Sequence, residues 1–238
     1  LAERMAQGIS AQELLVALRE EVLSTTKLPL AIDFLSAELK FHGVFGTAMA
    51  KLGHYFTAFQ TFLIQSSEDE RSRFDFRTAL EVLAREAKYR AEGGTTQGIF
   101  LYEFETLCRN RLGYDAGLNA ISHDPSFDAG WRAWLQIVRR QIGIVDFADL
   151  LYVRSQHYVN QQRAQGHAAP DEPVEVLFGE KEGKIALANR RKDPLLLFSA
   201  LERQLGYPTV PRPKVEPDEE RLLPSLARRV DRLESRLR

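Results

Sequence analysis

Cysteine is almost absent from this sequence, and the features of membrane and secreted proteins are missing altogether. Cys108 is the only cysteine, so the chain cannot form an internal disulfide and carries no sign of an oxidising compartment. No apolar run reaches the roughly 18 residues that a membrane-spanning helix requires. Residues 1–8 lack a basic region followed by an apolar core, so we expect no signal peptide. These absences predict a cytoplasmic protein without a membrane partner.

Excess charge of either sign is also missing. The 32 lysines and arginines nearly balance the 33 aspartates and glutamates, which gives a formal net charge of −1. A DNA-binding domain normally carries a basic surplus, because neutralising phosphates drives its affinity. The sharpest basic cluster, Arg190, Arg191 and Lys192, has no neighbouring aromatic residue on which a base could stack. The sequence therefore disfavours nucleic acid as a partner, and weak nucleic-acid binding through this cluster is our third functional hypothesis.

Motifs that mark common enzyme classes are missing too. The chain has no Gly-x-x-x-x-Gly-Lys phosphate loop, no Gly-x-Gly-x-x-Gly after a strand, no Cys-x-x-Cys pair, no Gly-x-Ser-x-Gly and no His-Glu-x-x-His. Cys108 lies in a predicted helix with no fixed base nearby, which indicates a buried structural thiol rather than a nucleophile. These absences favour a non-enzymatic protein with no cofactor.

What the sequence does contain is helical periodicity, in a composition typical of soluble globular domains. Hydrophobic residues make up 44% and charged residues 27%, and 238 residues are enough to bury a core. Ser10 and Glu13 form a capping box that starts the first helix. The apolar stripe between residues 30 and 66 is wide, and we expect it to divide into two helices that break near Gly46. We expect helices at about residues 10–23, at 30–66 in two parts, at 74–91, at 97–112 with Gly113 as its left-handed end, from Asp124–Asp128 onward, from Asp146 to near Gly166, and at 195–205.

The predicted fold class is all-α: a multi-helix globular bundle with a small mixed or helical appendage, a Pro-rich linker and a C-terminal coiled-coil helix. The helical domain covers residues 10–166, and the appendage at 167–207 docks on it. Within the appendage, residues 174–178 and 185–187 predict a small hairpin, with a short helix as an equal alternative for the second part. Four prolines make residues 208–218 an extended, stiff linker, and residues 219–238 form the coiled-coil segment.

Two pairs of residues are candidate metal ligands. Glu38 and His42 lie four residues apart on one face of a predicted helix, either as two ligands or as a hydrogen-bonded pair. His123-Asp124 is the dipeptide used by a class of helical metal-dependent phosphohydrolases, with His54 as a candidate upstream ligand. A proline follows this dipeptide at once, which indicates a helix start as the alternative. These residues carry the second functional hypothesis, a metal-dependent helical hydrolase or a metal-binding bundle.

A further group of polar residues lies on the helix predicted after residue 146. The group consists of Asp149, Tyr152, Arg154 and His157. On a partly apolar helix, such side chains can line a pocket, which is the default site of a helical bundle. The alternative is that they bridge to neighbouring helices or face water.

The C-terminal segment repeats leucine and valine in steps of three and four. The apolar positions are Leu223, Leu226, Val230, Leu233 and Leu237. They form the a/d seam of a coiled coil, in which Arg229 at g and Glu234 at the following e would pair between parallel helices. The alternative is an amphipathic helix docked on its own domain. Two heptads are short for a coiled coil, because short helices are marginal alone.

This seam gives the leading functional hypothesis. We predict parallel self-association through the C-terminal helix, and the β-branched Val230 favours a dimer over a trimer. Another protein partner is compatible with the same sequence. On this interpretation the protein is a non-enzymatic, self-associating scaffold or adaptor with a helical core.

Overall fold

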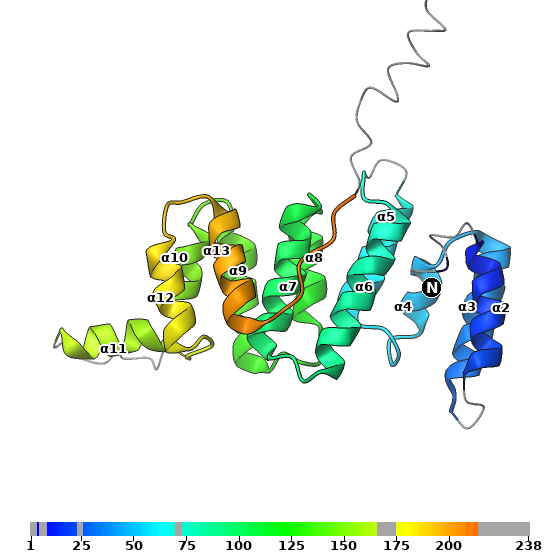
Figure 1. Ribbon diagram of the computed structural model, residues 1–238, viewed down its shortest axis with the longest axis horizontal. Coiled ribbons are helices and arrows are strands. Elements are labelled where there is room, and N and C mark those ends of the chain that lie inside the picture. Colours follow the sequence, from blue (N-terminus) through cyan, green and yellow to red (C-terminus); the bar gives the residue numbers. More distant parts are fainter. Residues whose placement is uncertain (1–3, 5–8, 23–25, 70–72, 166–174, 214–238) are drawn as a thin grey trace, which may run out of the picture.

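The computed structural model describes residues 4, 9–22, 26–69, 73–165 and 175–213, and these residues form twelve helices (Figure 1). In order along the chain they are α2 (Ala11–Glu21), α3 (Leu28–His42), α4 (Gly46–Lys51), α5 (Ala58–Glu68), α6 (Phe76–Ala91), α7 (Thr96–Arg109), α8 (Tyr114–Ser122), α9 (Ala129–Gln141), α10 (Phe147–Tyr152), α11 (Gln156–Ala164), α12 (Glu180–Ala188) and α13 (Pro194–Leu205). Extended pairing within these ranges is limited to two isolated bridges. The predicted all-α fold class is confirmed.

The helices stand side by side in one row (Figure 1). The α2–α3 pair occupies one end, α5 to α8 occupy the middle, and α9 to α13 form the other end, with α11 lying across the direction of the rest. Each helix packs mainly on its neighbours in the row, because α2 contacts α3, α3 contacts α4, and α6 contacts α7. None of the helices in the described ranges has the length and apolar content to cross a bilayer.

Helix α7 lies at the centre of the core. Every residue from 98 to 107 is buried, so this helix has no solvent face over most of its length. The ring of Phe100 lies 5.0 Å from that of Trp134 and 5.5 Å from that of Trp131, both on α9. A helix buried all round forces its charged residues into the interior, and Glu103 and Glu105 are such residues.

The boundaries of α2 and α13 follow the predicted capping signals closely. Ser10 and Glu13 make the reciprocal hydrogen bonds of a capping box at the start of α2. Asp193 caps α13, and Pro194 takes its first position. The same helix ends at Gly206, whose φ of 69° is left-handed as the predicted stop requires.

The segment 30–66 contains three helices rather than the predicted two. The first break covers residues 43–45, next to Gly46 as predicted: Gly43, with a φ of 71°, ends α3, and Gly46 begins α4. Gly46 has another reason to be glycine: its N–H donates to Glu68 Oε2 at 2.9 Å, and a Cβ there would collide with Gln65 of α5. The second break precedes Thr57, which caps α5 through a capping box.

Two predicted helix ends are wrong. Gly113 is not a left-handed terminus, because its φ is −63° and it begins α8, a helix that the sequence interpretation missed. Arg111, with a φ of 55°, takes the left-handed position instead. The helix predicted from Asp146 to near Gly166 is divided into α10 and α11, because Ser155 accepts a hydrogen bond from Tyr158 N–H and caps a new helix.

The predicted hairpin is also wrong for the described residues. Phe178 makes a single bridge to Ser155, and residues 180–188 form α12, which is the helical alternative for this part. Apolar contact with the core explains the difference, since Phe178 and Ala186 are buried against it.

Residues 207–213, which we call the strap, are not helical and lie against the middle of the row (Figure 1). Tyr207 is buried and donates its hydroxyl to Glu105 Oε2 at 2.8 Å. Arg85 of α6 donates to the carbonyl of Thr209, and Asn110 donates to that of Pro211. The predicted coiled-coil residues 219–238 lie outside the described residues.

Candidate functional site

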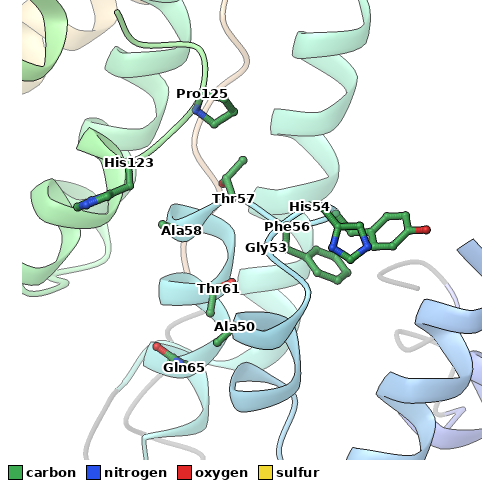
Figure 2. A pocket seen from close by; sticks show the side chains of 11 residues that line it. Ala50, Gly53, His54, Phe56, Thr57, Ala58, Thr61, Gln65, His123 and Pro125 are labelled. Atoms are coloured by element: carbon green, nitrogen blue, oxygen red, sulfur yellow. The ribbon is translucent and has the colours of Figure 1, made fainter. Parts of the chain in front are cut away.

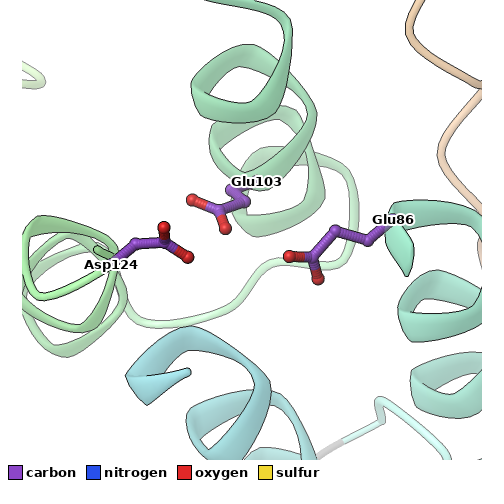
Figure 3. Close-up of side chains that lie close together, drawn as sticks. All are labelled: Glu86, Glu103 and Asp124. Carbon is purple, nitrogen blue, oxygen red and sulfur yellow. The ribbon is translucent and has the colours of Figure 1, made fainter. Parts of the chain in front are cut away.

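Three carboxylates from separate parts of the chain meet inside the molecule (Figure 3). This acidic cluster consists of Glu86 on α6, Glu103 on α7 and Asp124 in the turn between α8 and α9. One oxygen of each lies within 4.8 Å of the others. Their exposed fractions are 1%, 0% and 0%, so solvent does not reach them.

Local structure explains how each carboxylate is placed. Glu86 lies on the same buried face of α6 as Ala79 and Val82. Glu103 is interior because α7 is buried on all sides. The side chain of Asp124 is fixed by its own turn, where the backbone N–H of Ser126 donates to Oδ1 at 2.8 Å.

Arg90, near the end of α6, binds all three members of the acidic cluster. Its Nε donates to Glu86 at 2.7 Å, and its Nη2 donates to Glu103 at 2.9 Å and to Asp124 at 2.7 Å. Nη1 donates to the hydroxyl of Ser126 at 2.8 Å. Arginine suits this position because its guanidinium offers several donors in a fixed plane.

The acidic cluster is short of donors and of positive charge. One guanidinium faces three carboxyl groups, and Oε2 of Glu86 and Oε2 of Glu103 have no hydrogen-bond partner within the described part of the chain. Burial raises the pKa of Glu86 and raises that of Glu103 well above its usual range. Arg90 lowers the pKa of both glutamates, and Gln60 also lowers that of Glu86. These effects do not cancel the effect of burial.

The geometry of the acidic cluster fits a proton and does not fit a metal ion. The guanidinium of Arg90 already lies among the three carboxylates, and it would repel a divalent cation placed there. Both oxygens of Asp124 already accept hydrogen bonds from Arg90 or Ser126. A proton between Glu86 and Glu103 would supply the missing donor and reduce the excess negative charge.

The predicted metal ligands do not assemble into one site. His42 Nε2 lies 4.0 Å from Glu38 Oε2, and Lys51 Nζ lies 3.0 Å from the same oxygen, so this pair belongs to a surface ion-pair group. The Nδ1 of His123 lies 2.7 Å from the backbone oxygen of Asn119. Among the described residues, the one group of three metal-ligating side chains within reach of one another is the acidic cluster, and Asp124 is its sole predicted member.

His54 and His123 line the same cavity, which has a volume of about 480 Å³ (Figure 2). The His123 imidazole is directed away from His54, and the two rings lie on opposite sides of the cavity. The cavity wall contains no carboxylate, lysine or arginine. It therefore lacks the charged partners from which an acid–base pair or a metal centre is built.

The four residues predicted to line a pocket contact neighbouring segments of the chain instead. Asp149 pairs with Arg190, whose guanidinium lies 5.7 Å from the centre of the Tyr152 ring. His157 Nδ1 lies 2.8 Å from Glu180 Oε1 on α12. Arg154 offers its backbone carbonyl to the N–H groups of residues 177 and 178. These contacts correspond to the bridging alternative, and they also engage Arg190 of the basic cluster.

Cys108 is partly buried near the end of α7. Burial raises the pKa of its thiol to about 11, with Tyr114 opposing the rise. The thiolate is the reactive form of cysteine, so this environment supports a structural role.

The sequence interpretation missed Glu86, Glu103 and Arg90. One signal was available, because Glu103 interrupts an otherwise apolar stretch, Ile99–Phe104, in a helix whose apolar residues point in every direction. Arg90 follows Glu86 by four residues, which is the spacing of a helical ion pair. Nothing in the local sequence connects either residue with Asp124.

No family model matches this chain, and neither a curated protein nor a solved structure is significantly similar to it.

Proposed function

We propose that this protein is a non-enzymatic helical scaffold that self-associates through an exposed apolar face of α3. The observation that carries the proposal is the α3 stripe, which consists of Leu30, Phe34, Ala37 and Phe41. These positions follow one another in steps of four, three and four, so they lie on one face of the helix. The opposite face holds the buried residues Ala31, Ile32, Leu35 and Leu39.

The large apolar side chains of the α3 stripe are unusually exposed to solvent. Phe41 is 84% exposed and Leu30 is 69% exposed, whereas large apolar side chains are usually buried. Phe34 is half-buried, with the Lys51 ammonium 5.7 Å from its ring centre. Burying a phenylalanine or leucine side chain contributes about 1.5–3 kcal/mol, so covering this stripe would favour association.

The proposed occupant of the α3 stripe is a second copy of this chain. The α2–α3 pair stands at one end of the row (Figure 1), and the described residues leave Leu30 and Phe41 largely exposed there. A self-complementary contact between two copies would close as a symmetric dimer and bury both stripes.

The acidic cluster supports the non-enzymatic part of the proposal. Its carboxylates are closed off from solvent and bound to Arg90, so they cannot meet a substrate without local unfolding. Buried ion pairs of this kind are a structural feature in many folds.

The test compares two substitutions of equally exposed apolar residues. We expect Phe41→Glu to shift the full chain from dimer to monomer in light scattering at micromolar concentration. Ile144→Glu is the matched control, because Ile144 is 83% exposed but lies between α9 and α10. A monomeric wild-type chain, or a Phe41→Glu variant that associates as the wild type does, would overturn the proposal.

A further inference from the structure

We infer that the segment carrying Leu226, Val230, Leu233 and Leu237 packs on the α3 stripe of a second copy, so that two chains exchange their C-terminal segments. This inference rests on the proposed self-association and names the part of the partner that covers α3. In this arrangement the C-terminal seam packs on α3 of the second copy. In a parallel coiled coil it would instead pack on the C-terminal seam of that copy.

The two apolar faces match in period and length. The seam residues follow one another in steps of four, three and four, which are the steps of the α3 stripe. As helices, both faces extend over about 16 Å, since each residue adds about 1.5 Å. Two such faces can pack along each other over their whole length.

The charges beside the two faces are complementary. On a helix, Arg229 and Arg236 would flank one side of the seam and Glu234 the other. Asp33 and Lys40 flank one side of the α3 stripe and Glu38 flanks the other, and both carboxylates already have ion-pair partners in the described structure. Arginines facing Glu38, with Glu234 facing Lys40, would pair opposite charges across this contact.

The strap determines where the C-terminal segment leaves the domain. Contacts from Arg85 and Asn110 hold the strap against α6 and α7 up to Pro211. The residues from 213 to 226 can span about 40 Å when extended, which is enough to reach a neighbouring molecule. Prolines at 213, 217 and 224 favour an extended connection.

The length of the seam favours α3 over a second seam as its partner. The seam covers only two heptads, and isolated helices of this length are marginal in water. The α3 stripe belongs to a helix already fixed by packing on α2, so its own conformation does not have to be ordered on association.

The experiment is a complementation test in the full chain. Phe41→Glu damages the stripe and leaves the seam intact, whereas Val230→Asp damages the seam and leaves the stripe intact. We expect each variant alone to dimerise at least about tenfold more weakly than the wild type, because a charge would enter an apolar contact. An equimolar mixture of the two should recover dimers, since each mixed dimer retains one complete stripe–seam contact. Ile144→Glu should dimerise as the wild type does.

Each other outcome identifies a different contact. If Val230→Asp dimerises normally and Phe41→Glu does not, α3 pairs with α3: the inference fails and the proposed function stands. If Phe41→Glu dimerises normally and Val230→Asp does not, the seam pairs with itself, and both proposals fail. A mixture that stays monomeric also overturns the inference. Circular dichroism of each variant checks that the helical fold is retained.

Discussion

Arg90 is the residue that joins the most distant parts of the interior, because it binds carboxylates from α6, α7 and the α8–α9 turn. We predict that Arg90→Met lowers the free energy of unfolding by about 3–5 kcal/mol near neutral pH, since it leaves buried carboxylates without a counter-charge. Arg77→Met is the matched control on the same helix. Its partner Glu81 is exposed, so the loss should stay within about 1 kcal/mol. Urea denaturation measures the unfolding free energy of both variants. Equal losses of unfolding free energy would contradict this role for Arg90.

Protonation of the acidic cluster gives a second prediction at this scale. Burial raises the pKa of Glu103 and that of Glu86 in the folded chain, so the folded state binds protons more tightly than the unfolded state does. The stabilisation from these protons is complete below the ordinary glutamate pKa of about 4.3 and is lost as the pH rises through the folded pKa. Glu103→Gln keeps a neutral, hydrogen-bonding side chain at every pH.

We therefore expect the stability of Glu103→Gln relative to the wild type to increase as the pH rises above about 4.3. Urea unfolding at several pH values up to about 8 measures this difference. Glu81→Gln, on the exposed part of α6, is the matched control. A difference between Glu103→Gln and the wild type that stays constant across the range would mean that no proton is held in the cluster.

At the scale of helices, backbone conformation sets the boundaries that side chains do not. Gly206 ends α13 with a φ of 69°, a conformation that costs other residues about 1 kcal/mol. We predict that Gly206→Ala lowers the unfolding free energy by about that amount. Gly53→Ala is the control, because its φ lies outside the left-handed region and an added Cβ would meet no atom within 4 Å. Thermal denaturation of the two variants should separate them, and similar melting temperatures would count against a strained position at 206.

The helix starts show which elements could be predicted from the sequence. Helices α2 and α13, which begin at a serine cap and an aspartate cap, were predicted with nearly correct starts. Helix α8 was missed because Gly113 begins it without a side-chain cap. The division between α10 and α11 was missed because Ser155 is compatible with a helix interior until its contacts are known.

At the scale of the whole molecule, helical content could be predicted, but the order of helices in space could not. Periodicity identifies which face of each helix is apolar, and it does not say which neighbour covers that face. The acidic cluster depends on contacts between residues 34 positions apart, as between Arg90 and Asp124. Predicted metal ligands such as His42 and His123 were chosen by residue type, and the fold places them in different surroundings.

The strap also decides how mechanical tension would travel through the chain. It crosses from the end of α13 back to α6 and α7, so the described chain leaves from the middle of the row (Figure 1). A pull between α2 and residue 213 would pass through α6 and α7 and leave α9 to α13 unstretched. Those helices would bear force only after Tyr207 had been drawn away from Glu105. If the protein tethers other molecules, the half of the row beyond α8 is mechanically shielded.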